Sequence, residues 1–383
     1  MNQNLRRAAA LLAVLIMAVG FAGAENTGPG LSAPAMDRIP GELPEDLPTV
    51  LPGSTLTPEP TLPAPDPTPT LQPGIVTAAS DSETESEGGL LPLPELPALE
   101  SGRLVTIPLD QDSTSDSLPP LEELYLYREG EENPYGYADP SIAVVLGTGR
   151  IYDTNYMYAR VRIADASQLR AIMASPTNAK STVPGHKLAA RVQAVVAING
   201  DYNGGDDVRL GALVRQGKVI RLNCHKDIDL LAIKKNGDLV ILPKASNEDV
   251  NAVLDDCMHI FTFGPALVVD GVAQEIPRIG RIGSHKKAQR MALCQTGPLE
   301  YLLITSEGPE DRDSVGLTIP QFTELIASFP EVITAYNLDG GSSATMVFRK
   351  NGKNWAKVNC PNNKKVRPLK DIVYFADAWE PGY

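Results

Sequence analysis

The segment 337–346, Asn-Leu-Asp-Gly-Gly-Ser-Ser-Ala-Thr-Met, combines residue types that could do chemistry. Asp339 stands directly before Gly340 and Gly341, which permit positive φ angles and let another molecule approach bare backbone closely. Small hydroxyl side chains follow, as in a loop that binds a sugar or a phosphate: Ser342, Ser343 and Thr345. The alternative is a polar turn between two strands, although a hairpin needs only Asp-Gly.

Read together with four other blocks, this segment resembles the phosphodiester glycosidase family. The resemblance implies hydrolysis of a bond between a sugar and a phosphate, and it covers roughly residues 140–377. The blocks, in the order of the family, are Ala197–Tyr202, Phe263–Gly271, Gln289–Leu293, Asn337–Met346 and a weaker match at Val366–Leu369.

Three positions depart from the family pattern. Met291 replaces the usual threonine, Ser342 stands where a third glycine is common, and Asn203 replaces a frequent second aromatic residue. These departures leave the resemblance intact, but the identity of the substrate stays open.

Cleavage of a glycosidic bond usually needs a pair of carboxylates around an oxocarbenium-like transition state. A phosphate is best held by positive charge, which a guanidinium presents in a fixed fork. We therefore predict three catalytic carboxylates, namely Asp339, Glu307 (which matches an acidic-glycine position of the family) and Asp201. We predict substrate binding by Asn199, Arg290, Gly340, Gly341, Ser343, Thr345 and Arg367, with the two arginines on the phosphate. The spacing does not assign nucleophile, acid or base.

Each assignment has a simpler alternative. Asp339 could only cap its own turn, and Arg290 could be the partner in a structural ion pair. Asp201 could bind Ca²⁺ together with Asp206 and Asp207, because residues 201–207 are rich in oxygen ligands, although they depart from the EF-hand pattern. No other cofactor is expected, and the identity of any metal stays open.

The first 24 residues are typical of an export signal. Arg6 and Arg7 precede an almost wholly apolar stretch, and the small residues 22–24 suit signal peptidase. We expect a secreted or cell-surface protein, with an uncleaved N-terminus as an alternative membrane tether.

Residues 25–120 are predicted to be a disordered linker. They contain 19 of the 33 prolines, and their 16 acidic and two basic residues account for the net charge of the whole chain, −13. Such a stretch cannot form helices or sheets, and it would be extended. Residues 121–383 are close to neutral, which argues against nucleic acid as a partner.

Residues 121–383 are long enough for one domain with a sizeable core. Runs of apolar and β-branched residues predict strands at 142–146, 156–163, 192–198, 230–233, 239–242, 301–304, 332–336 and 372–375. Two helices are predicted, one capped by Ser167 over 168–174 and one capped by Thr318, with Pro320 in its first turn and Gln321 completing a capping box. The pattern indicates an α+β domain with few helices and a mixed or mainly antiparallel sheet. The four cysteines could be free thiols or paired.

The function predicted from these observations is hydrolysis of sugar-1-phosphodiesters in an extracellular glycan or a cell-wall polymer. The alternative is a glycan-binding protein without catalysis. A binding module needs aromatic platforms more than paired acids, and only 5% of the residues are aromatic, with Trp355 and Trp379 the sole tryptophans.

Overall fold

The computed structural model describes residues 89–113, 122–176, 178, 181–201, 211–225, 228–352, 354–360 and 366–382. The predicted export signal, most of the predicted linker and the stretch 202–207 that was considered for Ca²⁺ lie outside these residues.

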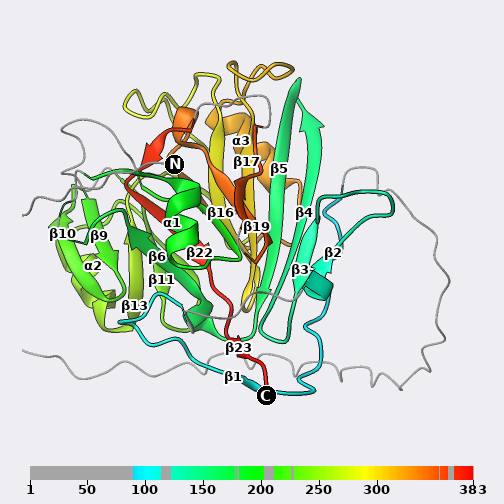
Figure 1. Cartoon of the computed structure of the whole chain (residues 1–383). Helices are drawn as coiled ribbons and strands as arrows, with labels where there is room; N and C mark the ends of the chain where they lie inside the picture. The colour runs from blue at the N-terminus through cyan, green and yellow to red at the C-terminus, as the bar shows by residue number, and fades with distance from the viewer. Residues whose placement is uncertain are drawn as a thin grey trace, which may run out of the picture. The chain divides into compact units, whose positions relative to one another are not determined.

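Three antiparallel sheets make up most of the domain (Figure 1). The largest has nine strands, in the order β15 (Val272–Ala273), β14 (Ala266–Val269), β18 (Thr334–Leu338), β16 (Arg290–Gly297), β17 (Glu300–Ser306), β5 (Thr154–Ile163), β4 (Ile142–Ile151), β3 (Gly136–Ala138) and β2 (Tyr125–Leu126). The second has the order β20 (Asn354–Lys357), β19 (Met346–Asn351), β8 (Val196–Asn199), β22 (Asp371–Phe375) and β6 (Leu169–Met173). The third has the order β10 (Lys218–Asn223), β9 (Gly211–Arg215), β13 (Cys257–Phe261), β11 (Leu230–Lys234) and β12 (Leu239–Leu242).

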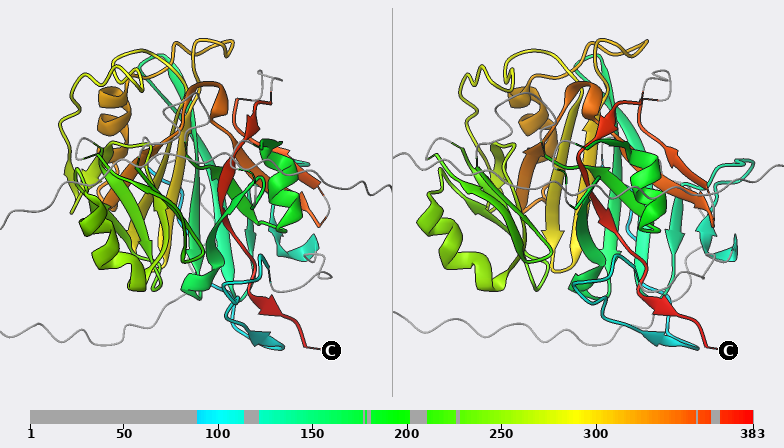
Figure 2. Two further views of the ribbon diagram at one scale, coloured as in Figure 1. Left: turned by 90° about the vertical axis from the view of Figure 1, so that its left-hand side faces the viewer. Right: turned by 60° about the vertical axis from the view of Figure 1, so that its left-hand side comes forward.

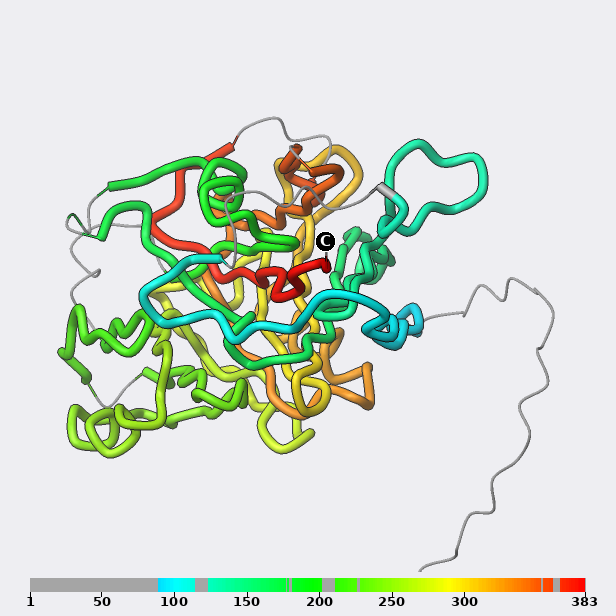
Figure 3. Tube along the Cα trace, turned by 60° about the horizontal axis from the view of Figure 1, so that its bottom comes forward, coloured from blue at the N-terminus to red at the C-terminus, as the bar shows by residue number. Residues whose placement is uncertain are grey.

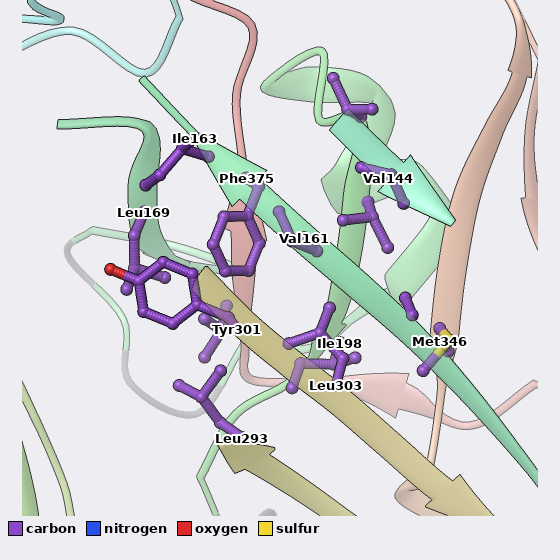
Figure 4. Close-up of a cluster of buried hydrophobic side chains, with 14 of the residues drawn as sticks. Val144, Val161, Ile163, Leu169, Ile198, Leu293, Tyr301, Leu303, Met346 and Phe375 are labelled. Atoms are coloured by element: carbon purple, nitrogen blue, oxygen red, sulfur yellow. The ribbon is translucent and has the colours of Figure 1, made fainter. Parts of the chain in front are cut away.

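The sheets enclose one central core, because their strands alternate between an inner and an outer face. In β17, Tyr301 and Leu303 point into the central core, whereas Leu302 and Ile304 belong to a separate outer cluster. Side chains from the other two sheets join the same core. Figure 4 shows Ile198 of the second sheet beside Leu303, and Leu231 and Phe261 of the third sheet belong to the same cluster.

Each of the three α-helices covers the outer face of a different sheet (Figure 2). α3 (Ile319–Ala327) packs on the nine-stranded sheet, α1 (Gly185–Arg191) on the second sheet and α2 (Asn247–Val253) on the third. The α+β architecture with antiparallel sheets and few helices therefore confirms the predicted fold class.

The α3 helix begins as predicted. The Thr318 side chain accepts a hydrogen bond from the Gln321 N–H, the Gln321 side chain returns to Thr318, and Pro320 lies in the first turn. The other predicted helix is wrong. A short 3-10 helix, Ala166–Gln168, is capped by Asp165, and strand β6 follows at once. Pairing of β6 with β22 outweighs local helix propensity there.

The predicted strand 192–198 is too long, and two helices were not foreseen. α1 runs up to Arg191, and β8 begins only at Val196. Neither α1 nor α2 is longer than seven residues, so neither repeats the apolar period often enough to be recognised. The α2 helix nevertheless carries a capping box between Ser246 and Asp249, which was a usable sequence signal.

Residues 89–113 pack along the domain, so the folded part begins well before the predicted boundary at residue 121. Ile107 is 2% exposed and belongs to the cluster beneath α1. β1 (Arg103–Leu104) pairs with β23 (Trp379–Glu380), and Figure 3 shows this segment beside the C-terminal segment. The buried Arg170 guanidinium donates hydrogen bonds to backbone carbonyls of the same segment, including that of Pro108 at 3.0 Å. Removing residues 25–120 would therefore remove part of the core.

All four cysteines are free thiols, namely Cys224, Cys257, Cys294 and Cys360. This settles the choice that their spacing left open.

Among the described residues, no helix has both the length and the apolar character required to cross a membrane.

Candidate active site

The polar blocks of the sequence meet at one end of the nine-stranded sheet, the upper end in Figure 1. Arg290 at the start of β16 pairs with Ser306 at the end of β17, and Met291 pairs with Leu338 at the end of β18. Glu307 directly follows the last residue of β17, and Asp339 directly follows the last residue of β18. They therefore lie at the same edge, with only β16 between their strands, which corresponds to about 10 Å.

The loop 339–345 connects two different sheets. β18 pairs with β14 and β16, whereas β19 pairs with β8 and β20, so the loop does not close a hairpin. Asn199, at the end of β8, holds both ends of the loop. Its Nδ2 donates to the Asp339 carbonyl at 2.7 Å, and its Oδ1 accepts from the Thr345 N–H at 3.0 Å. The simple turn considered for this segment is therefore wrong.

The two glycines of the loop have different reasons to be glycine. A Cβ on Gly340 would lie 2.6 Å from the carbonyl oxygen of Gln289, so any side chain there would collide with backbone. Gly341 has a φ of +58° and open space where a Cβ would be, and its N–H donates to the same Gln289 carbonyl at 2.9 Å. The loop therefore lies tightly on the backbone of β16 and leaves one face accessible.

The hydroxyl groups of the loop also differ. Ser343 is fully buried, and its Oγ has no hydrogen-bond partner among the described residues. A buried polar atom without a partner is costly and therefore suggests a place for a further polar group. Ser342 is reached by Arg367, whose Nη1 lies 3.1 Å from its Oγ while the arginine stays exposed.

Glu307 is 7% exposed and is oriented by two side chains. Its Oε2 accepts hydrogen bonds from Asn155 Nδ2 at 2.9 Å and from Ser314 Oγ at 2.6 Å. The Glu307 N–H also donates to the Asn155 carbonyl at 2.8 Å. The two side-chain donors and the backbone hydrogen bond together fix the position of the Glu307 carboxylate.

A cavity of about 450 Å³ opens beside Glu307. It is lined by the tips of β4 and β5, by the end of β17 and by Asn359 and Cys360. Burial raises the pKa of the Cys360 thiol to about 12, with nearby Asp311 adding to the effect. The thiol is therefore neutral near pH 7 and is not a nucleophile there.

Asp201 belongs to a buried ion cluster next to the loop. Its Oδ2 lies 3.0 Å from Arg215 Nη2, and the same guanidinium pairs with Asp371. Its Oδ1 accepts from the N–H groups of Thr262 and Phe263 at 2.8 and 3.1 Å. Burial raises the pKa of Asp201, and Arg215 opposes the rise. Both oxygens are thus engaged by the protein, an arrangement suited to positioning the backbone at residue 201.

Arg290 and Arg367 occupy contrasting positions. Arg290 is 3% exposed, and its guanidinium donates to the carbonyls of Leu317 at 2.9 Å, Gly283 at 3.1 Å and Lys286. Desolvation lowers its pKa to about 10. Arg367 is exposed beside the 339–345 loop. The contacts of Arg290 are those of a residue that holds a neighbouring loop, whereas Arg367 presents its charge to solvent.

The structure thus brings Asp339, Glu307, Asn199, Arg290, Gly340, Gly341, Ser343 and Thr345 to one edge, with Arg367 beside the loop and Asp201 in the adjoining ion cluster. Sequence reasoning missed Arg215 and Asp371, which complete that cluster, and Asn155 and Ser314, which orient Glu307. None of these four lies within a recognisable motif block. Asn155 and Glu307, like Arg215 and Asp371, are brought together from more than 150 residues apart, whereas Ser314 lies seven residues after Glu307.

Within the described part of the chain, no group of three or more His, Cys, Asp or Glu side chains is arranged to hold a metal ion.

The model of the phosphodiester glycosidase family matches residues 192–376, which confirms the predicted resemblance. No curated protein sequence matches the chain.

One solved structure shows a related fold. The catalytic domain of zebrafish N-acetylglucosamine-1-phosphodiester alpha-N-acetylglucosaminidase, auto-inhibited by its pro-peptide, is 18% identical with a TM-score of 0.51, and the match covers 62% of this chain and 84% of that one. A hypothetical protein from Synechocystis is 16% identical with a TM-score of 0.42, over 63% of this chain and 64% of that one. At such identities the likeness concerns the fold alone.

Proposed function

We propose that this protein is a hydrolase that cleaves the bond between the anomeric carbon of a sugar and a phosphate. The observation that carries the proposal is the placement of Asp339 and Glu307 at one edge of the sheet, two strands apart. Asp339 begins the glycine loop, and Glu307 lines the cavity. The match to the family model supports the same reaction class.

In the proposed reaction, water adds to the anomeric carbon while the bond from that carbon to the phosphate oxygen breaks. The products are the free sugar and a phosphomonoester. A phosphate oxygen leaves readily, so the leaving group needs less help from an acid than an alcohol does. The hydrogen bonds from Asn155 and Ser314 orient Glu307, whose carboxylate could stabilise positive charge at the sugar or activate water.

The remaining predicted residues would hold the substrate. Arg367 is the exposed guanidinium beside the loop and can reach a phosphate in solution. The unpartnered Oγ of Ser343 can bond a sugar hydroxyl if the substrate enters the loop. Asn199 acts on the loop through its two hydrogen bonds, so we assign it to positioning.

We further propose that the protein acts outside the cytoplasm on a sugar-phosphate glycan or wall polymer. Nucleic acid is not proposed as a partner. The support is the sequence of residues 1–24, which has the charge and apolar pattern of an export signal, retained as a tether if it is not cleaved.

A glycan-binding protein without catalysis is the rival function. The test is turnover of a panel of sugar-1-phosphodiesters by the full-length protein, with and without chelator, beside the Asp339→Asn and Glu307→Gln variants. Glu310→Gln serves as a control, because Glu310 is exposed three residues from Glu307. Binding without turnover in the wild type would favour the rival. Full activity in both site variants would instead show that the catalytic groups lie elsewhere in the protein. A loss on adding chelator would instead indicate a metal.

A further inference from the structure

Residues 276–289, which we call the basic loop, carry an uncompensated cluster of positive charge. They contain five basic side chains and no Asp or Glu: Arg278, Arg281, His285, Lys286 and Lys287. All five residues are exposed. None of them forms an ion pair with any residue that the structure describes. Residues 121–383 are nearly neutral as a whole, so this cluster is a local feature.

The basic loop is held in one shape by buried polar contacts. The Arg290 guanidinium donates to the carbonyls of Gly283 and Lys286. Ser284 is 1% exposed, and its Oγ accepts from the Ile279 N–H at 2.8 Å and donates to the Pro277 carbonyl at 3.0 Å. A loop fixed in this way presents its charges without a large loss of conformational entropy on binding.

The apolar residues of the basic loop point inward and its charges point outward. Ile276 and Ile282 pack with the cluster beneath α3, where Phe322 and Leu317 are also buried. The Ile319 N–H donates to the Ser284 carbonyl at 2.8 Å, so the start of α3 supports the loop as well. The basic side chains therefore form the solvent-exposed face of the basic loop, which is packed against the domain.

The basic loop borders the candidate active site. The carbonyl of its last residue, Gln289, accepts a hydrogen bond from the Gly341 N–H. Lys287 lies two residues before Gln289, which corresponds to about 7 Å along the chain. At its other side, Arg281 Nη2 donates to the Phe263 carbonyl at 3.2 Å, and the Phe263 N–H donates to Asp201. The positively charged residues of the basic loop thus extend from the 339–345 loop to the Asp201 cluster.

We infer that the basic loop binds further phosphates of a polyanionic substrate, namely a glycan polymer with repeated phosphodiester links, while one link lies at Asp339 and Glu307. The inference rests on the proposed function. One phosphodiester carries a single negative charge, and Arg367 can meet it. The four additional cations of Arg278, Arg281, Lys286 and Lys287 exceed that need, and they match an extended chain of negative charges.

Single-stranded nucleic acid is the other polyanion that such a surface could meet. Proteins that bind it combine positive charge with aromatic side chains on which bases stack. Residues 276–289 contain no Phe, Tyr or Trp. The composition of the loop therefore favours a polymer recognised through its phosphates alone.

The test compares a glycosyl-1-phosphodiester of one repeat with oligomers of several repeats, using the full-length protein and the Lys286→Gln/Lys287→Gln variant. We expect the wild-type KM to fall as repeats are added and to rise with salt. The variant should raise the KM for the oligomers by about 2- to 30-fold, the sum of two exposed charge contacts. Its kcat and KM on the single repeat should match the wild type.

The matched control is Lys235→Gln/Lys350→Gln, which makes the same change in charge at the opposite ends of β11 and β19 from the site. The control should behave as the wild type on every substrate. Equal KM values for single repeats and oligomers in the wild type, or equal changes on both substrates in the Lys286/Lys287 variant, would overturn the inference.

If no sugar phosphodiester is turned over, the proposed function fails, and the basic loop is then judged by binding alone. The probe is fluorescent inorganic polyphosphate, titrated with the wild type, the variant and the control. Weaker binding by the variant only would uphold a polyphosphate-binding surface, and equal binding by all three would refute it. Tighter binding of a single-stranded oligonucleotide of equal charge would replace the glycan polymer by nucleic acid.

Discussion

Carboxylates lie at both ends of the central core, and their surroundings differ. At the end opposite the candidate site, Asp139 is fully buried and accepts from the Tyr137 hydroxyl at 2.7 Å, the Ser141 N–H at 2.6 Å and the Ile142 N–H at 2.9 Å. Tyr137 and Ser141 also donate to Asp377. At the candidate site, Glu307 is bound by two side chains on one oxygen only, beside an open cavity.

The comparison indicates how hydrogen bonding from the protein distinguishes structural carboxylates from accessible ones in this domain. Where every acceptor is met by protein donors, a ligand has nothing left to bind, and the acid serves the fold. Where donors fix one oxygen and space adjoins the other, the acid is oriented and still accessible. The predictions below test this contrast, beginning with the largest expected effect.

Asp339→Asn should lower kcat on a sugar-1-phosphodiester by about 10²- to 10⁴-fold, the range for losing one general acid or base. The change is isosteric, so a residue that only capped its loop would tolerate it. The measurement is steady-state turnover, with circular dichroism to confirm folding. Near-normal turnover in a folded variant would move the chemistry to Glu307 or Asp201.

Asp139→Ala should leave the kcat of the folded protein unchanged and lower the free energy of unfolding by about 3 kcal/mol or more. The variant leaves the buried N–H groups of Ser141 and Ile142 without their acceptor, and each unsatisfied buried group costs about 1–3 kcal/mol. Chemical denaturation measures the loss. A variant that stays as stable as the wild type but loses activity would reverse the roles of the two ends.

Arg290→Lys and Arg367→Lys should separate structural from ligand-binding arginines at the same end. Arg367→Lys is expected to lose about tenfold in kcat/KM on phosphodiesters, near the low end for a charge-assisted bond, and little on neutral aryl glycosides. Arg290→Lys should lose activity equally on both, since its partners are the carbonyls of Leu317, Gly283 and Lys286. A phosphodiester-selective loss at Arg290 would restore it as the phosphate ligand.

The last expected effect is a dependence of stability on pH from the Asp139 end. Burial and the charge of Asp377 raise the pKa of Asp139 to about 7. The folded protein therefore holds a proton that the unfolded chain has lost. This contribution to the free energy of unfolding should fall as pH rises from about 4 to about 7, by at most about 1.4 kcal/mol per pH unit. The difference in stability between the wild type and Asp139→Asn isolates it. A difference that rises with pH would contradict this assignment.

Local patterns in the sequence predicted much of the fold. The predicted strands 142–146, 230–233 and 301–304 all lie within strands of the structure. The capping box at Thr318 placed α3 correctly. These features depend on neighbours within a few residues, so a single sequence contains them.

Other elements depended on distant partners and were therefore missed. Residues 169–173 became a strand because β22, some 200 residues later, pairs with them. Residues 89–113 look like a linker by composition, yet carbonyls in this segment accept hydrogen bonds from Arg170, and Ile107 enters the core. Proline-rich composition rules out regular structure, but it does not prevent a segment from packing.

By itself the sequence determined the fold class, the order of the motif blocks and the residue types that gather at the candidate site. Only the tertiary structure decided which of those side chains remain available to bind a ligand. Arg290 and Arg367 are the same residue type in similar motifs, but the carbonyls of Gly283 and Leu317 surround the first, while solvent surrounds the second. The physical reason is that hydrogen bonding and desolvation are set by atoms brought together across long stretches of chain, and residue type and local spacing do not contain that information.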